Sequence, residues 1–183
     1  RRGEEHLNME GFHSGAPNLC RVCVDAWAGG EATGRLYHCY SKQPEPIGRT
    51  SDVLDSIDRL CDRLNYPART QQPRRFGPQK PRPQPQTPQK KVEPQMTRDE
   101  LAEQKGKMAT FVVHVMYRQH STWQGSVTWA ETGEKANFRS ALELIKLMDS
   151  AVDETLEDES PPQDEPNLAR PKNPVREETD YET

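Results

Sequence analysis

The sequence has 183 residues, of which 32% are hydrophobic and 30% are charged, and its mean hydropathy is −1.03. Because a folded core must offset roughly 1–2 kcal/mol of backbone entropy per residue, a chain this polar is not folded along its whole length. No run approaches the roughly 20 apolar residues that a membrane-spanning helix needs, which excludes a helical membrane protein. The first residues carry no apolar stretch, so we expect no secretory signal.

After a flexible N-terminus at residues 1–11, the first ordered unit is predicted over residues 12–66. Alternation of apolar side chains indicates strands near residues 20–26 and 36–40. Apolar residues at helical spacing from 53 to 64 then predict a helix. Ser51 or Asp52 is the expected N-cap of that helix.

A linker is predicted over residues 67–97. Residues 67–95 carry seven basic residues and one acid, together with eight prolines and seven glutamines. Proline fixes the φ angle and removes an amide donor, so this composition favours an extended polyproline II spacer.

The second ordered unit is predicted over residues 98–152. Thr97 and Glu100 form a capping box for a short helix. Strands are expected near residues 110–119 and 127–129, and a helix from Ser140 onwards. Residues 153–183 carry eleven acids and three bases, which predicts a disordered acidic tail.

The two units repeat the same order of elements. An offset of 91 residues aligns their strands, for example Val22 with Val113, and an offset of 88 aligns their helices, for example Ile57 with Ile145. One such unit is too small to bury an adequate core. We therefore predict an α+β fold in which two strand–strand–helix (ββα) units form one antiparallel sheet with both helices on one face. The units pair either within one chain or between two chains, as a homodimer that exchanges units.

Four residues are weak candidate ligands for zinc: Cys20, Cys23, His38 and Cys39. Alternation along a strand places Cys20 and Cys23 on opposite faces, and the chain has no second CxxC motif, so we expect no metal and no cofactor. Cys23 and Cys39 are also candidates for a cross-strand pair. A Cys–His nucleophile would combine Cys23 or Cys39 with His38 or His114, but no third group is in place to orient it. We therefore expect no enzymatic activity.

The segment around Trp123 is a candidate contact surface for a protein partner, because an exposed tryptophan beside polar groups is typical of interfaces. Its neighbours in this patch are Arg118, His120 and Gln124. The alternative is that Trp123 folds back over the edge of the sheet.

The linker is a candidate nucleic-acid-binding segment, because its charge would attract phosphates and Phe76 would stack on a base. The residues concerned are Arg74, Arg75, Phe76, Lys80, Arg82, Lys90 and Lys91. The default interpretation is a solvated spacer.

The segment Thr122-Trp123-Gln124-Gly125-Ser126-Val127-Thr128-Trp129, followed by Asn137-Phe138-Arg139-Ser140-Ala141-Leu142-Glu143-Leu144, resembles a group of small bacterial, Firmicute-like proteins of unknown function. Residues 34–38 through 64–67 resemble a companion group, which is also uncharacterised. This resemblance implies a bacterial cytosolic protein and no particular activity. We therefore expect a non-catalytic protein-binding or scaffold module with an unidentified protein partner, the alternative being a nucleic-acid-binding accessory protein that uses the linker and the sheet face.

Overall fold

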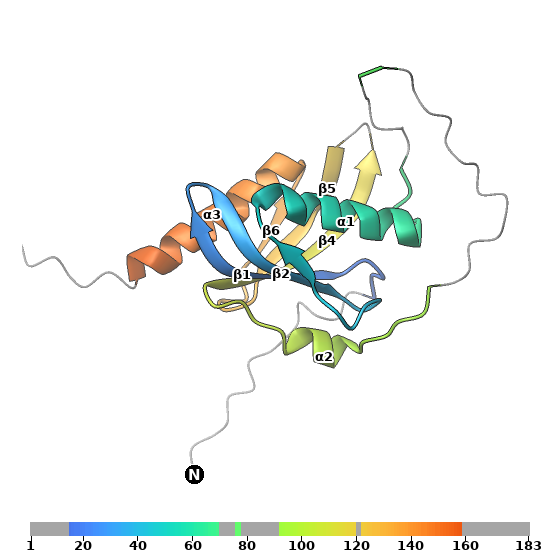
Figure 1. Cartoon of the computed structure of the whole chain (residues 1–183). Coiled ribbons are helices and arrows are strands. Elements are labelled where there is room, and N and C mark those ends of the chain that lie inside the picture. The colour runs from blue at the N-terminus through green and yellow to red at the C-terminus, as the bar shows by residue number, and fades with distance from the viewer. Residues whose placement is uncertain (1–14, 70–75, 78–91, 120–121, 159–183) are drawn as a thin grey trace, which may run out of the picture.

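Six strands form one antiparallel sheet in the order β3-β2-β1-β4-β5-β6 (Figure 1). The computed structural model describes residues 15–69, 76–77, 92–119 and 122–158. Its elements in chain order are β1 (Cys20–Ala28), β2 (Glu31–His38), β3 (Glu45–Ile47), α1 (Thr50–Leu64), α2 (Arg98–Ala102), β4 (Ala109–Gln119), β5 (Thr122–Trp129), β6 (Lys135–Phe138) and α3 (Ala141–Asp158). The predicted α+β class with an antiparallel sheet is confirmed.

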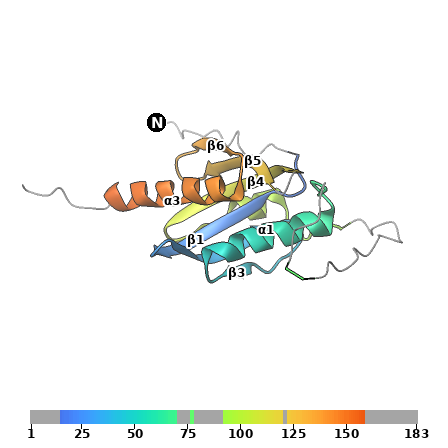
Figure 2. The same ribbon diagram turned by 90° about the horizontal axis from the view of Figure 1, so that it is seen from above.

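The long helices α1 and α3 cover one face of the sheet (Figures 1 and 2). The short helix α2 lies on the opposite side (Figure 1). α1 packs against β2 and β3, whereas α3 packs against β4, β5 and β6. Each long helix therefore covers its own half of the sheet. Among the described residues no helix is long and apolar enough to cross a membrane.

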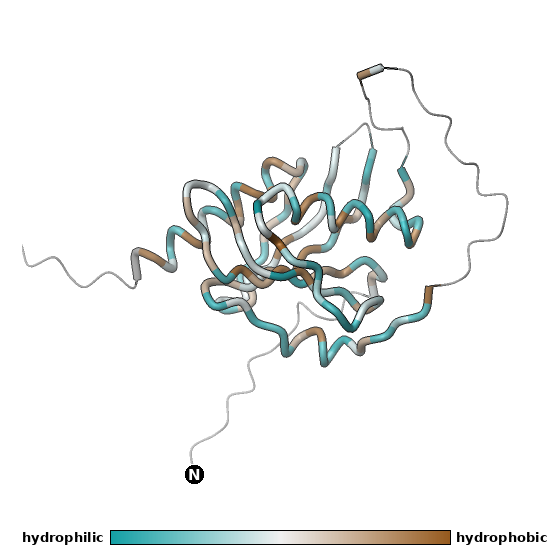
Figure 3. Tube along the Cα trace, in the orientation of Figure 1, coloured by the Kyte–Doolittle hydropathy of each residue, from teal (hydrophilic) through white to brown (hydrophobic). Residues whose placement is uncertain are grey.

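The main hydrophobic core lies between the sheet and the two long helices. Alternate residues of each strand point into it, and Figure 3 shows hydrophobic and hydrophilic segments alternating along α1. Its largest fully buried side chains include Phe111, Phe138, Leu36, Ile57 and Leu144. Each large apolar side chain buried in this way stabilises the fold by roughly 1.5–3 kcal/mol. A second, smaller cluster joins Cys23, Tyr37 and Leu101 of α2.

The two halves of the sheet have corresponding registers. The β1–β2 ladder pairs Val24 with Gly34 just before a bulge, and the β4–β5 ladder pairs Val115 with Gly125 just before another bulge. Gly34 also lies opposite Ile47 of β3, and Gly125 opposite Phe138 of β6. Each of these positions in the second half follows its counterpart by 91 residues.

Each half contains a third strand that the sequence analysis missed, so the sheet has six strands rather than the four expected. β3 has three residues and β6 has four, which is too short for alternation to be recognised in the sequence. Pro46 in β3 has no amide hydrogen to donate, and in the sequence a proline favours a loop over a strand. Both strands lie at the edges of the sheet, where short strands are common.

The offset of 88 residues for the helices was wrong. At an offset of 91, Val53 corresponds to Leu144 and Ile57 to Met148, and all four side chains are fully buried. Ile145, which the offset of 88 pairs with Ile57, is only half-buried. Both helices are rich in apolar residues, so sequence alone allowed two alignments that differ by almost one turn.

The ends of several elements differ from those predicted. The N-cap of α1 is Arg49 rather than Ser51 or Asp52, and the Asp52 carboxylate accepts from the Arg49 amide at 3.1 Å. α3 extends to Asp158, past the predicted unit boundary at residue 152.

The Gln95 and Met96 amides, at the end of the predicted linker, donate to the Cys39 carbonyl at 2.7 and 3.0 Å. The capping box of Thr97 and Glu100 is confirmed.

We expect Gly125→Ala to destabilise the fold by about 2 kcal/mol or more, as overpacking does in other cores. A Cβ at this position would lie 2.0 Å from the His114 carbonyl oxygen and 2.8 Å from Cζ of Phe138. Urea unfolding would measure the loss. Gly15→Ala is the control, because its Cβ would meet nothing within 4 Å. Equal stability of the two variants would contradict the close approach of β4 and β5.

Candidate binding cleft

The structure does not bring the candidate zinc ligands into one site. Cys20 lies in the main core, whereas Cys23 lies in the cluster on the opposite face of the sheet. All four cysteines are free thiols, and the described residues contain no group of three His, Cys, Asp or Glu side chains that could hold a metal ion. Cys23 pairs with Arg35 rather than Cys39, so the expected cross-strand pair of thiols was wrong.

Burial keeps these thiols protonated. It raises the pKa of Cys23 to about 11 and also raises the pKa of Cys39. The reactive form of cysteine is the thiolate, so both thiols are weak nucleophiles at neutral pH. Burial lowers the pKa of His114, with further lowering by Lys135 and Arg98. These groups do not form the polarised pair that nucleophilic catalysis requires.

The predicted patch around Trp123 is only partly exposed. Trp123 is half-buried and packs against the main core. Gln124 is exposed, and His120 lies outside the described residues. Arg118 is buried, with 5% of its surface accessible, so its expected role as an exposed contact was wrong.

Arg118 instead joins the two halves of the fold. From β4 its Nη1 donates to Asp58 Oδ1 at 3.1 Å and to Asp62 Oδ1 at 2.6 Å, both on α1, and its Nε donates to the Pro67 carbonyl at 2.8 Å. Arg69 forms ion pairs with the same two aspartates. Burial raises the pKa of Asp62, but hydrogen bonds from Arg69 and Arg118 outweigh it, and the net pKa is lowered.

We expect Arg118→Met to reduce the free energy of unfolding by about 1–3 kcal/mol, the cost of leaving a buried acceptor without its donor. The substitution leaves the Pro67 carbonyl without the Arg118 donor, and Asp58 and Asp62 keep Arg69 as their cationic partner. Arg49→Met is the control, because the ion pair of Arg49 with Asp52 is exposed, and its stability should match the wild type in urea. If Arg118→Met unfolded at the same urea concentration as the wild type, Arg118 would not stabilise the contact between β4 and α1.

A polar network connects α1 to the sheet at the edge of the first half. His38 Nδ1 accepts from the Tyr40 amide at 3.1 Å, and His38 Nε2 lies 3.5 Å from Glu45 Oε1. Arg59 of α1 donates to Glu45 Oε2 at 2.8 Å and to the Ser56 hydroxyl at 2.9 Å. Burial is the largest influence on His38 and lowers its pKa, although Glu45 acts in the opposite direction.

We expect the protein to lose stability between about pH 7 and 5, since His38 and His114 both have lowered pKa values in the folded state. Unfolded histidine has a pKa of about 6.5, so the unfolded chain binds more protons in this range and acid favours unfolding. The contribution of these two histidines to the free energy of unfolding is complete above about pH 6.5 and is lost as the pH falls towards their folded pKa values. Urea unfolding of His38→Asn and His114→Asn should each show a flatter dependence on pH. If the variant with both substitutions kept the wild-type dependence of stability on pH, these two histidines would not be its source.

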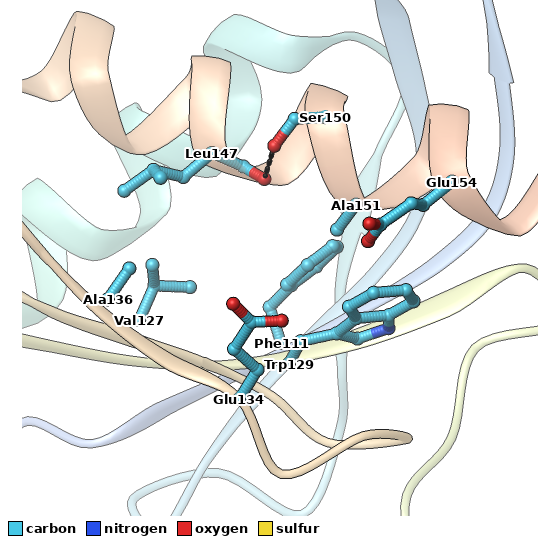
Figure 4. Close-up of a pocket in the computed structure, with 9 residues that line it drawn as sticks. All are labelled: Phe111, Val127, Trp129, Glu134, Ala136, Leu147, Ser150, Ala151 and Glu154. Atoms are coloured by element: carbon cyan, nitrogen blue, oxygen red, sulfur yellow. Dashed lines mark hydrogen bonds between the residues drawn. The ribbon is translucent and has the colours of Figure 1, made fainter.

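In the second half, the corresponding space is an open cleft between α3 and the strands β4, β5 and β6 (Figure 4). Its volume is about 260 Å³. Its lining residues are Phe111, Val127, Trp129, Glu134, Ala136, Leu147, Ser150, Ala151 and Glu154. Six of the nine lining residues are apolar, and the two glutamates are the acids of the lining.

Differences at a few side chains leave this space open. At an offset of 91, Ala136 takes the place of Glu45 and Ser150 takes the place of Arg59. The long side chains that form the ion pair under α1 therefore correspond to two short ones under α3. Since the strand registers of the halves correspond, side-chain size accounts for the cleft.

The two carboxylates of the cleft have no cationic partner. Within the described part of the chain, neither the Glu134 nor the Glu154 side chain makes a hydrogen bond or an ion pair. Figure 4 shows them approaching the cleft from different elements, Glu134 from the turn before β6 and Glu154 from α3. Both residues are exposed, so the cleft is accessible to solvent at this rim.

The sequence analysis did not identify this cleft. Its lining comes from β4, β5, β6 and α3, and β6 was not predicted. The one available signal was the pair of short side chains at 136 and 150 where the first half has Glu45 and Arg59, and it becomes visible only at the offset of 91.

Comparison with known proteins adds no relative: no family model, no curated protein and no solved structure matches this chain.

Proposed function

We propose that this protein is a non-catalytic binding module that holds one side chain of a partner protein in the cleft between α3 and β4-β5-β6. The observation that carries the proposal is an accessible cavity of about 260 Å³ in which six of the nine lining residues are apolar. This volume lies just below the usual range for small-molecule sites, which is roughly 300–1,000 Å³, and suits a single side chain.

The chemistry of the lining supports binding rather than catalysis. Ser150 is the only hydroxyl among the lining residues, and its Oγ donates to the Leu147 carbonyl at 3.0 Å within its own helix. No histidine or cysteine lines the cleft. A serine nucleophile needs an adjacent base to accept its proton, and the lining supplies no such pair.

We also propose that the two halves are copies of one unit of three strands and a helix. The corresponding bulges, glycine positions and helix faces, all at an offset of 91 residues, support this relationship. Under this proposal the first copy carries the Glu45–Arg59 ion pair where the second copy has two short side chains and the cleft. The cleft is then the feature that distinguishes the two copies.

The alternative function is nucleic-acid binding by the linker. Phe76 supports it, because its side chain is fully exposed and free to stack on a base. The basic residues Arg74, Arg75, Lys80, Arg82, Lys90 and Lys91 lie outside the described residues. Homodimerisation by exchange of units, a cytoplasmic location and a bacterial origin likewise stay predictions.

Affinity purification of the tagged full chain from its native cells, with and without nuclease, tests the proposed function. We expect Ala136→Phe to fill the cleft and lose the partner that the wild type retains, as measured by quantitative mass spectrometry. Asn137→Phe is the matched control, because this exposed neighbour lies on the same strand and points to the other face.

A urea midpoint close to the wild type must accompany the loss of partner in Ala136→Phe, so that unfolding does not account for it. Retention of every partner by the folded variant would overturn the proposal. Loss of all partners on nuclease treatment would favour the linker instead, and binding should then weaken steeply with salt.

A further inference from the structure

We infer that the cleft receives a basic side chain, a lysine or an arginine of the partner protein, with its methylenes on the apolar lining and its charge between Glu134 and Glu154. This inference rests on the proposed function and specifies the chemistry of the occupant. Three independent features of the described residues support it.

The first feature is the unbalanced charge at the rim. Glu134 and Glu154 both line the cleft, and neither has a hydrogen-bonding or ionic partner in the described part of the chain. The neighbouring Lys135 points to the other face of the sheet, as alternation along β6 requires, and it acts on His114 there. An incoming cation would therefore meet two uncompensated carboxylates, whereas an anion would be repelled by both.

The second feature is the first half of the same molecule. There Arg59 of α1, with 65% of its side chain exposed, contacts the Glu45 carboxylate of β3 at 2.8 Å. The position equivalent to Arg59 is Ser150, whose side chain is too short to reach a carboxylate across the cleft. The fold thus contains one example of a basic side chain that pairs with a carboxylate between this helix and the edge strand, and the equivalent position in the second half does not supply it.

The third feature is the distribution of apolar and polar surface. Phe111 and Val127 on the sheet and Leu147 on α3 supply apolar surface for the methylenes of a long side chain (Figure 4). The Trp129 ring lies beside the carboxylates and offers an aromatic face to a cation. Lysine and arginine combine an apolar stem with a charged end, which matches an apolar lining beside an acidic rim.

The test uses the full chain and three blocked tripeptides that differ only in the central side chain: arginine, citrulline and norleucine. Heteronuclear NMR would follow the Trp129 indole and the amides of Ala136 and Ala151 during titration. We expect the arginine peptide to shift these resonances and to bind about tenfold more tightly than the two neutral peptides, as a charge-assisted contact does. The difference should shrink at high salt.

Two variants test the charges directly. Glu134→Gln combined with Glu154→Gln should reduce the affinity for the arginine peptide to that of citrulline. Ser150→Arg should supply the missing cation from α3, by analogy with Arg59, and should block the peptide. Leu142→Arg is its matched control, because it adds the same charge at an exposed position of the same helix and should leave binding unchanged.

The outcomes separate this inference from the proposed function. Equal binding of the three peptides in the cleft would overturn the inference but leave the cleft as a binding site. Absence of any shift, combined with loss of the partner in Ala136→Phe, would also overturn the inference alone. Absence of any shift, combined with retention of every partner in Ala136→Phe, would overturn both.

Discussion

Pairing of β1 with β4 at the centre of the sheet is the interaction on which the rest of the structure depends. Each half has three strands and one long helix, and its outer strand has only three or four residues. Such a half alone would expose one edge of its longest strand and could not bury an adequate core. The ladder from Cys20–Val113 to Val24–Ala109 removes both edges at once and makes one continuous core beneath α1 and α3.

The corresponding registers of the halves place different side chains at equivalent positions. Beside α1, Glu45 and Arg59 form an ion pair in which 65% of the Arg59 side chain stays exposed to solvent. Beside α3, the equivalent residues Ala136 and Ser150 are short and line the cleft. These two residue differences distinguish the cleft from the equivalent region of the first half.

Local sequence patterns predicted the parts of this fold that local physics determines. The central strands, the amphipathic helices and the capping box at Thr97 all followed from periodicity and capping chemistry. The short edge strands, the burial of Arg118 and the cleft did not, because each depends on segments that meet from distant parts of the chain. Arg118 illustrates the limit: its partners, Asp58 and Asp62, precede it by more than fifty residues. A charged side chain in a polar stretch is predicted to be exposed when its partners in the fold are not known.

The same comparison of halves identifies two further acids on α3 close in sequence to Glu154. At an offset of 91, Asp58 and Asp62 of α1 correspond to Asp149 and Asp153 of α3, so the acids are present in both helices. The position of Arg118, which neutralises the first pair, corresponds to Trp27, an uncharged residue packed against the core. α3 therefore carries Asp149 and Asp153 without that arginine, close in sequence to Glu154 at the cleft. A negative potential of this kind steers basic partners over distances comparable to the screening length, about 8–10 Å in physiological salt.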